Sequence, residues 1–358
     1  MKVLVIGPSP TKSKGGMATV IRGISEDSNL NQMFDIDIFE SYIDGSKIIR
    51  LLYTIYSYLK FCTIYKKYDL FHVHMASYGS TFRKAFYIST LKRHGKKVIV
   101  HIHGASYLVF FDKLKQEKKQ CVIDTLKSAD MVIALSDKWK ESFVSTFGLT
   151  NCVSLNNGIN IDEFAGARSD TIRYKDSFLF LGRLGTRKGA YDLIEAIDRA
   201  AKKGVNITCY MAGDGEIQKV KAIIKEKQLE NHIIINGWVD FEGKIELLKK
   251  VSTVVLPSYN EGLPMAILEG MASQKAIITT RVGAIPEVVK DGENGFVIEP
   301  GNIDALTAAL ISCSNNVNIL ERMALNNSLK INNEFSRKYI NGKLAVYYKN
   351  FLNRCEYE

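Results

Sequence analysis

Short β-rich runs alternate with longer amphipathic segments along the chain, and this alternation constrains the fold more than any other feature. In the first half the β-rich runs are residues 2–7, 34–40, 70–75, 97–104 and 131–136. In the second half they are residues 177–184, 206–215, 232–239, 251–258, 276–281 and 295–300. Strands that alternate with helices form parallel sheets covered by helices on both faces. Two such series predict an α/β chain with two doubly wound domains.

The segment 154–177 separates the two series. It carries an Asn-Gly turn signal and a polar stretch before the next β-rich run. With 358 residues, the chain is long enough for two domains of ordinary size. We therefore expect an amino-terminal domain over 1–165 and a carboxy-terminal domain over 166–334. The last helix, expected over 335–358, has an apolar stripe that needs a partner surface, and we expect it to pack back on the first domain.

The composition is that of an ordinary globular protein, with 46% hydrophobic and 24% charged residues. No apolar run reaches the roughly 18 residues needed to span a bilayer. The opening MKVLVIGPSP has too short an apolar run for a signal peptide and indicates a first strand. The six cysteines are scattered without CxxC pairs, which argues against a disulfide framework or a zinc site. We therefore expect a cytoplasmic protein.

Positive charge is concentrated in the first half of the chain. The net charge is +10, and residues 45–127 hold 16 basic but only 4 acidic residues. Within this region, residues 46–68 combine helical periodicity with five tyrosines and interspersed basic residues. The segment is either a core helix with one solvent-exposed face or a basic, aromatic surface that binds anionic lipid. We expect peripheral contact with the inner face of the cytoplasmic membrane, and no nucleic acid, because no nucleic-acid motif accompanies the charge.

Two glutamates lie around the start of a helix expected after the strand at 251–258. Glu261 lies at the carboxyl end of this strand, where open α/β sheets bind ligands, and Glu269 lies in the apolar run MAILEGMA. Pro264 suits a first helical turn, whose free N–H groups bind anions. Because an unpaired buried carboxylate is costly, Glu269 should meet donors such as the hydroxyls of a sugar or ribose. Alternatively, Glu261 caps the helix and Glu269 pairs with a lysine or arginine.

Arg183 and Lys188 lie five residues apart in the glycine-containing turn LGRLGTRKG, between a strand and a helix. A guanidinium and an ammonium on one loop can converge on a diphosphate. The stretch also fits a solvated basic turn. MAGDGE, which contains Gly213, adds a second glycine turn after a strand but does not by itself indicate a nucleotide.

Five of the six histidines precede residue 104, in part as the motifs HVH (72–74) and HIH (101–103). Alternating histidines on two neighbouring strands share one face and could hold a metal. No acidic residue lies at ligand spacing, so we expect no metal, with His103 reaching a cleft and the others packing or hydrogen-bonding near the strand ends. The DxD motif of Asp35 and Asp37 lies on a strand-like run rather than in a phosphate loop, so we expect a surface-strand role.

These motifs together resemble the retaining GT-B glycosyltransferases of glycosyltransferase family four. The segment 257–302 resembles the family's donor-binding signature and reads PSYNEGLPMAILEGMASQKAIITTRVGAIPEVVKDGENGFVIEPGN. The supporting matches LNNGIN, LGRLGTRKG, AGDGE and GWV occur in the family's order. The stretches GPSPTKSKGGMATVI and HIHG resemble the family's first loop and its acceptor-side His-Gly. The resemblance implies the GT-B fold, in which two Rossmann-like domains with parallel sheets face a central cleft.

The resemblance also implies a role for individual residues. Arg183 and Lys188 are implied to bind the donor diphosphate and to stabilise its charge as it leaves. Glu269 is implied to accept hydrogen bonds from the ribose. The other implied contacts are Glu261 with the backbone N–H groups of Gly262 and Leu263 at the sugar, Gly15 and Gly16 at the phosphates, Gly213 in the nucleotide turn, Trp238 and Val239 beside the base, and His103 near the reacting centre.

The implied reaction moves a hexosyl unit from a nucleotide-sugar, with UDP favoured over GDP, to a saccharide acceptor with retention at the anomeric carbon. We expect the acceptor to be lipid-linked and to belong to bacterial surface polysaccharide or glycan biosynthesis. No cofactor or metal is expected, because the two cations can absorb the charge of the departing phosphate. Closure of the domains about residues 155–175 is expected to exclude water. A nucleotide-sugar epimerase of the same fold and a non-catalytic GT-B binding subunit remain as alternatives.

Overall fold

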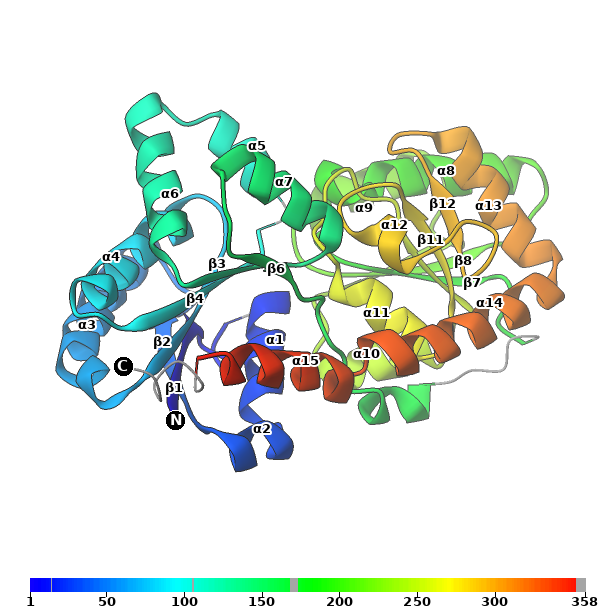
Figure 1. The fold of residues 1–358 in the computed structure, drawn as a ribbon. Helices are drawn as coiled ribbons and strands as arrows, with labels where there is room; N and C mark the ends of the chain where they lie inside the picture. The colour runs from blue at the N-terminus through cyan, green and yellow to red at the C-terminus, as the bar shows by residue number, and fades with distance from the viewer. Residues whose placement is uncertain (14, 105, 168–172, 352–358) are drawn as a thin grey trace. The chain divides into compact units, whose positions relative to one another are not determined.

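The computed structural model of the protein describes residues 1–13, 15–104, 106–167 and 173–351. The chain forms two compact units, of which the first comprises Met1–Gly158 with Arg337–Glu358 and the second comprises Ile159–Ser336 (Figure 1). The units thus divide after residues 158 and 336, where the sequence placed the divisions after 165 and 334.

The first unit is built on a six-stranded parallel sheet. Its strands, in spatial order, are β2 (Asp35–Tyr42), β1 (Lys2–Pro8), β3 (Leu70–Met75), β4 (Lys97–Ile102), β5 (Met131–Ala134) and β6 (Cys152–Ser154). β3 and β5 are buried along their whole length, as expected where helices cover both faces of a sheet. The chain order reverses between β1 and β3, which makes the carboxyl ends of these strands a place where ligands bind in such sheets.

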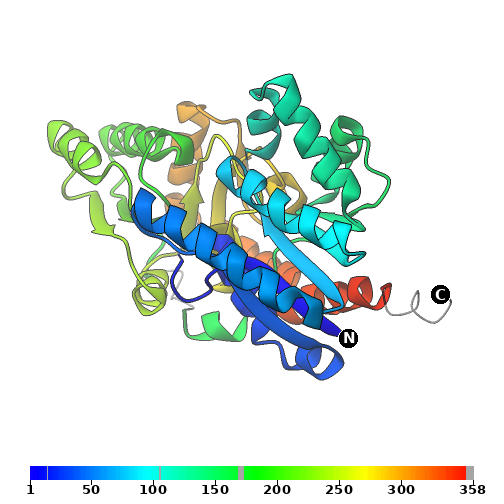
Figure 2. The same ribbon diagram turned by 90° about the vertical axis from the view of Figure 1, so that its left-hand side faces the viewer.

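Helices cover both faces of this sheet. They are α1 (Gly16–Ser25), α2 (Ser28–Met33), α3 (Lys47–Ile64), η1 (Tyr65–Lys67), α4 (Gly79–Arg93), α5 (Tyr107–Asp112), α6 (Gln116–Ser128), α7 (Asp137–Phe147) and α15 (Arg337–Lys349). α3 and α4 lie on the outside of the unit (Figure 2). Leu344 and Tyr348 of α15 pack with Val3 and Val5 of β1, so the last helix completes the core of the first unit.

The last helix is shorter than the sequence predicted. It begins at Arg337, after Ser336 in an extended conformation, and it ends at Lys349, where residues 350 and 351 form a turn. Residues 352–358 of the predicted helix lie outside the described residues.

The second unit is a second six-stranded parallel sheet. Its strands, in spatial order, are β12 (Phe296–Ile298), β11 (Ala276–Thr280), β10 (Thr253–Leu256), β7 (Ser177–Leu181), β8 (Thr208–Ala212) and β9 (Ile233–Gly237). Its helical segments are η2 (Asp162–Ala167), η3 (Thr186–Lys188), α8 (Ala190–Lys202), α9 (Ile217–Glu226), α10 (Phe241–Leu248), α11 (Met265–Ala272), α12 (Ile285–Val288), α13 (Ile303–Asn315), α14 (Val317–Lys330) and η4 (Ile331–Phe335). The chain order reverses between β7 and β10.

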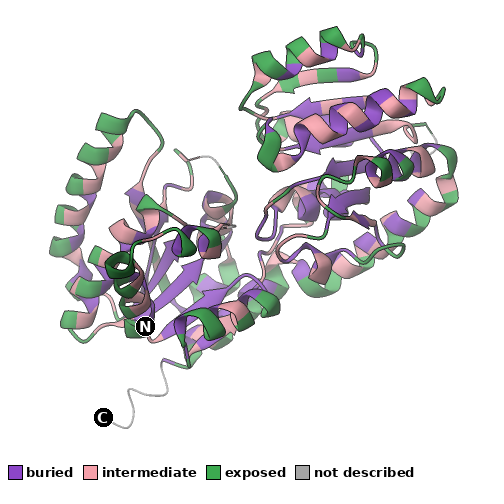
Figure 3. Cartoon of the chain, turned by 90° about the horizontal axis from the view of Figure 1, so that it is seen from above, coloured by how far each residue is buried: buried purple, intermediate pink, exposed green. Residues whose placement is uncertain are grey.

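The predicted architecture is confirmed. Each of the eleven β-rich runs contains a strand, both sheets are parallel, and the buried strands lie beneath helices whose outer faces are exposed (Figure 3). The sequence missed β6, which is only three residues long and adjoins the segment taken for the domain boundary. Among the described helices, none is long and apolar enough to cross a membrane.

Candidate functional site

The carboxyl ends of β7 and β10 lie side by side at the point where the chain order of the second sheet reverses. Lys188 lies at the end of η3, in the loop after β7, and Glu261 lies in the loop after β10. Hydrogen bonds to backbone carbonyls join these loops: the Tyr259 N–H donates to the Arg187 carbonyl at 2.9 Å, and Arg187 Nη1 donates to the Asn260 carbonyl at 3.1 Å. The two loops therefore form one structural element at a position where open α/β sheets bind ligands.

Lys188 and Glu261 form a buried ion pair at this edge. The Lys188 ammonium contacts Glu261 Oε1, and the two side chains are only 13% and 6% exposed. The same carboxylate oxygen accepts a 2.8 Å hydrogen bond from Ser258 Oγ, and Arg187 Nη1 lies 4.0 Å away. Because neither charge is in contact with much water, each depends on the other for compensation.

The close approach of the two loops depends on a glycine. Gly189 follows Lys188 in a left-handed conformation with φ +72°, and a Cβ at this position would lie 2.0 Å from the Pro257 carbonyl oxygen. A side chain there would push the loop after β7 away from the loop after β10. The glycine thus keeps Lys188 within reach of Glu261.

Arg183 belongs to the same loop but points to a different carboxylate. Its Nη1 lies 3.5 Å from Asp214 Oδ2, and both side chains are almost two-thirds exposed, so the pair contributes little to stability. The alkyl chain of Lys188 passes beside Gly182, the residue that precedes Arg183. Both predicted cations therefore lie on one loop. Lys188 is held by a buried ion pair, whereas Arg183 can leave its exposed partner for a ligand with little loss of stability.

The glycine turn after β8 packs directly on the loop after β7. The Gly213 N–H donates to the Gly237 carbonyl at 2.7 Å, and a Cβ on Gly213 would lie 1.9 Å from the Gly182 carbonyl oxygen. Trp238 and Val239 follow the end of β9, and the Trp238 side chain is 54% exposed. The residues predicted from four separate motifs thus lie at the carboxyl ends of neighbouring strands.

Glu269 has a partner within the chain. It lies on α11, is 7% exposed, and accepts a 2.6 Å hydrogen bond from Lys244 Nζ of α10. The prediction that its partners arrive with a ligand is therefore incomplete, and the alternative of a lysine partner is confirmed. The alternative that Glu261 caps this helix is wrong, because Pro264 is the N-cap and no side chain caps it. The sequence missed Lys244 because no local spacing connects it with Glu269.

In the first unit, Gly15 and Gly16 form the start of α1. Gly15 has φ +114°, and no atom lies within 4 Å of the place where its Cβ would be, so the backbone conformation itself requires glycine. Gly16 is the first residue of the helix. The chain therefore enters α1 through two glycines, so no side chain covers the backbone at the start of this helix.

His103 follows β4 and is one of four adjacent imidazoles, of which two lie on β3 and one on β4. Its Nε2 lies 2.8 Å from His74 Nδ1, and His72 Nε2 lies 3.3 Å from His101 Nδ1. His72 Nδ1 also lies 2.7 Å from the Tyr348 hydroxyl of α15. Burial lowers the pKa of all four rings, to about 3 for His72 and His103, so the cluster is neutral near pH 7.

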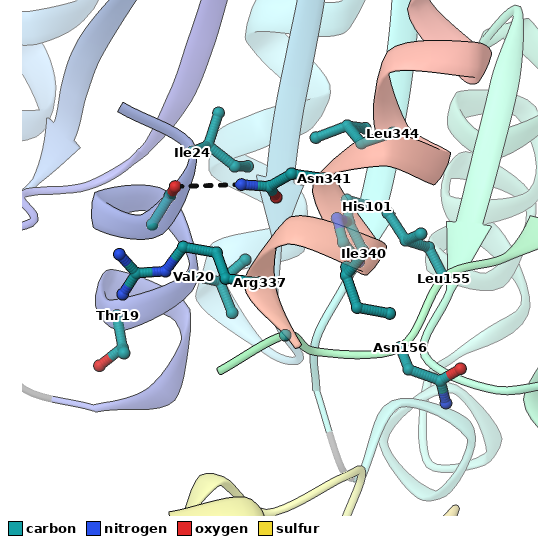
Figure 4. Close-up of a pocket in the computed structure, with 12 residues that line it drawn as sticks. Thr19, Val20, Ile24, His101, Leu155, Asn156, Arg337, Ile340, Asn341 and Leu344 are labelled. Atoms are coloured by element: carbon teal, nitrogen blue, oxygen red, sulfur yellow. Dashed lines mark hydrogen bonds between the residues drawn. The ribbon is translucent and has the colours of Figure 1, made fainter. Parts of the chain in front are cut away.

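Three of these rings could geometrically hold a metal ion. Ring nitrogens of His72, His74 and His101 lie within 4.8 Å of one another, and Nε2 of His74 and of His101 have no hydrogen-bond partner among the described residues. His101 also borders a small cavity between α1 and α15, near Leu155 and Ile340 (Figure 4). The three-histidine group contains no acidic ligand, so a divalent charge in this buried place would lack compensation, and the expectation of no metal stays a prediction.

Asp35 and Asp37 lie on β2, as predicted. Lys2 Nζ lies 3.0 Å from Asp35 Oδ2, and the Tyr68 hydroxyl donates to Asp37 Oδ2 at 2.8 Å. Both carboxylates thus bind side chains of neighbouring residues at the surface of the sheet, which agrees with the predicted surface-strand role.

Comparisons with known proteins match both halves of the chain to glycosyltransferases. The family described as "Glycosyl transferases group 1" matches residues 169–329, and "Glycosyltransferase Family 4" matches residues 32–163. An uncharacterised glycosyltransferase of Methanocaldococcus jannaschii is 27% identical over 293 residues, which are 75% of this chain and 80% of the relative. The capsular polysaccharide biosynthesis glycosyltransferase CapM of Staphylococcus aureus is 24% identical over 71% of this chain and 68% of CapM.

Solved structures share the fold over nearly the whole chain. Sucrose-phosphate synthase from Thermosynechococcus elongatus has a TM-score of 0.80 at 17% identity, with 99% of each chain covered. HepE from Anabaena, solved in complex with UDP, has a TM-score of 0.77 at 17% identity and covers 98% of this chain and 100% of its own. At this level of identity the likeness concerns the fold alone.

Proposed function

Because the chain belongs to the GT-B glycosyltransferases of glycosyltransferase family four, we propose that it transfers a hexosyl unit from a UDP-sugar to a saccharide acceptor with retention at the anomeric carbon. The observation that carries the proposal is the buried pair of Lys188 and Glu261 between β7 and β10. A cation and an anion in contact at this edge suit a ligand that offers a diphosphate and sugar hydroxyls side by side.

The donor diphosphate is bound by Lys188 and Arg183, together with N–H groups at the start of α11. Lys188 supplies a compact charge and Arg183 a planar fork of donors, the two geometries that phosphate oxygens accept. Glu261, with the backbone N–H groups of Gly262 and Leu263, holds the sugar. The nucleoside is held by Glu269 at the ribose, by Trp238 and Val239 beside the base, and by the turn at Gly213.

The reaction needs no protein nucleophile. The bond from the anomeric carbon to the phosphate oxygen breaks, and the bond to the acceptor oxygen forms on the same face of the sugar. The acceptor hydroxyl proton passes to the departing phosphate oxygen, and UDP leaves. Lys188 and Arg183 stabilise the charge that develops on the phosphate. Glu261 and Glu269 are each bound to a lysine, which suits positioning groups better than an acid/base pair.

UDP is the proposed carrier, and a surface polysaccharide is the proposed product. HepE, which shares the fold, was solved with UDP and with UDP-glucose. CapM acts in capsular polysaccharide biosynthesis, and a relative in Salmonella typhimurium is a putative colanic acid biosynthesis glycosyltransferase. We extend this to a lipid-linked saccharide acceptor. In the first unit, the roles of Gly15, Gly16 and His103 stay predictions.

A thermal-shift screen against UDP, GDP and their hexose conjugates tests the donor. A ligand at 100 times its Kd should stabilise the protein by about 2.7 kcal/mol, which corresponds to a rise in Tm of roughly 5–10 °C for a unit of this size. We expect this rise with UDP and UDP-sugars and little change with GDP. A larger shift with GDP-sugars would contradict the choice of carrier.

Product analysis tests the reaction itself. We expect the donor to be consumed only when a saccharide acceptor is present, with the product retaining the donor's anomeric configuration by NMR. Donor isomerisation without any acceptor would instead identify a nucleotide-sugar epimerase. Donor binding without turnover across a panel of acceptors would indicate a binding subunit.

A further inference from the structure

The outer side of α3 exposes a continuous set of large apolar side chains. The α3 face, as we call it, consists of Ile48, Ile49, Leu51, Leu52, Ile55, Tyr56 and Leu59. Each of these side chains is between 51% and 71% exposed. They recur at helical spacing along one helix on the outside of the first unit (Figure 2). An apolar surface of this kind marks an interaction site in a soluble domain.

The core of the first unit does not need these side chains. α3 packs against the sheet by its opposite side, where Ser57 and Phe61 are buried. On the neighbouring α4, the 66% exposed Phe86 extends the apolar surface, and its ring lies 6.4 Å from that of Tyr58. Phe86 also borders a groove of about 890 Å³ between α4 and α6. The segment is therefore a core helix through Phe61, as one of the two interpretations predicted, but its exposed face is apolar where that interpretation expected a polar one.

The charged side chains of α3 itself and of η1 are all positive. α3 contains no acidic residue, and its lysines Lys47 and Lys60 are both exposed. Lys66 and Lys67 follow in η1, also exposed. A second copy of this chain would bring the same cations against these, because symmetric pairing places identical surfaces together. An anionic partner with an apolar interior meets both properties of the face.

We propose that the α3 face binds an anionic lipid bilayer, with α3 lying in the plane of the headgroups. A helix in this position buries its apolar side among the acyl chains and keeps its lysines at the lipid phosphates. Because α3 begins five residues after β2 ends, the first residues of the α3 face lie near the carboxyl edge of the sheet. On the proposed function, this places the edge that receives a lipid-linked acceptor next to the membrane.

Vesicle flotation of the full-length protein tests the proposal. We expect the protein to float with vesicles of phosphatidylglycerol and phosphatidylcholine, but not with phosphatidylcholine alone. Binding should weaken as sodium chloride rises from 0.05 M to 0.5 M, because salt screens the lysine–phosphate attraction. Equal binding to both kinds of vesicle, or none to either, would overturn the proposal.

Two pairs of matched variants locate the contact. Leu52→Gln/Leu59→Gln removes two leucines from the α3 face, each 62% exposed, whereas Leu325→Gln/Leu329→Gln changes two leucines of α14 that are 60% and 55% exposed. We expect the first variant to weaken vesicle binding at least tenfold and the second to leave it unchanged. Equal losses in both would refute the assignment to α3.

A second matched pair of variants tests the contribution of the lysines to vesicle binding. Lys47→Gln/Lys60→Gln should weaken binding about 25-fold, since each lysine near an anionic surface contributes about fivefold. Lys221→Gln/Lys225→Gln, on the exposed side of α9, serves as the control and should change little. Similar losses in the two lysine variants would show that net charge, and not the α3 face, determines binding.

Two further measurements separate this proposal from its alternatives. If a second copy covers the face, analytical ultracentrifugation will show a dimer that Leu52→Gln/Leu59→Gln dissociates, without any vesicle binding, and the proposal fails. The rise in Tm with UDP should be the same in this variant as in the wild type. A failure of membrane binding is therefore distinguishable from a failure of the proposed glycosyl transfer.

Discussion

Replacing Lys188 by methionine tests the central feature of the candidate site. The substitution keeps most of the length of the side chain but removes the ammonium that contacts the buried Glu261 carboxylate. It therefore has two separate effects, one on stability and one on turnover. Both follow from the same ion pair, and a second substitution can distinguish them.

The stability effect comes from the carboxylate that is left behind. Removing one partner of a buried pair costs about 3–5 kcal/mol, because the other charge stays buried without compensation. Ser258 still donates to Glu261, and Arg187 lies 4.0 Å away and half exposed, so we expect the lower end of this range. A loss of about 3 kcal/mol corresponds to a fall in Tm of roughly 6–12 °C for a unit of this size.

The effect on turnover comes from the lost charge at the leaving group. Removing one donor that stabilises a developing anion lowers kcat about 100- to 1,000-fold. Adding Glu261→Gln to Lys188→Met removes the uncompensated charge, so the double variant should recover most of the lost Tm. Its activity should stay low, because the ammonium is still absent and the carboxylate proposed to hold the sugar is also gone.

The measurements are thermal unfolding by circular dichroism and initial rates at saturating donor, taken at least 15 °C below the Tm of the least stable variant. A Lys188→Met enzyme within tenfold of the wild-type kcat would refute the role of this lysine at the leaving group. Failure of Glu261→Gln to restore Tm would refute the account of the pair. Recovery of both stability and turnover would show that Lys188 serves the fold alone.

Four further outcomes are expected. Glu269→Gln should raise the KM for the donor about 10- to 100-fold with little change in kcat, since a ribose contact is the same in ground and transition states; a fall in kcat alone would contradict this. Gly213→Ala should lower the free energy of unfolding in urea by more than about 2 kcal/mol, because a Cβ there meets the Gly182 carbonyl; an unchanged midpoint would show that the loop adapts. Burial lowers the pKa of Lys275 to about 7, so the unfolded chain binds more protons between pH 7 and 10.5. The stability of the wild type should therefore rise relative to Lys275→Met as the pH is raised from 7 to 10, and a constant difference would contradict the lowered pKa. Turnover should survive dialysis against EDTA, and loss with recovery on adding a divalent cation would contradict the expectation of no metal.

The fold was predictable because buried parallel strands leave a local signal. β10 and β11 are continuous apolar or β-branched runs, and helical segments separate the strands. β6 left no such signal, since three residues are too few to show a period. That the candidate residues of the second unit gather at one edge of its sheet was also predictable, because most of them lie in loops that follow predicted strands.

The partners of the site residues were not predictable in the same way. Lys188 and Glu261 are 73 residues apart, and Lys244 and Glu269 are 25 residues apart, so both pairs arise only from the packing of separate elements. The HVH and HIH motifs placed each pair of rings on one face, but the parallel register of β3 with β4 sets His74 beside His101. The orientation of α3 was not predictable either, because the sequence of the helix alone does not show which of its sides packs against the sheet.

The pair of Lys188 and Glu261 has a consequence for which ligands the site should prefer. Each of the two groups neutralises the other, so a ligand that engages only one of them leaves the other buried with weaker compensation. Free UDP offers phosphates to Lys188 but nothing to Glu261, and a free hexose offers hydroxyls to Glu261 but no anion to Lys188. A nucleotide-sugar meets both groups at once. On the proposed function, the ion pair therefore favours the intact donor over UDP, which helps the product to leave after each transfer.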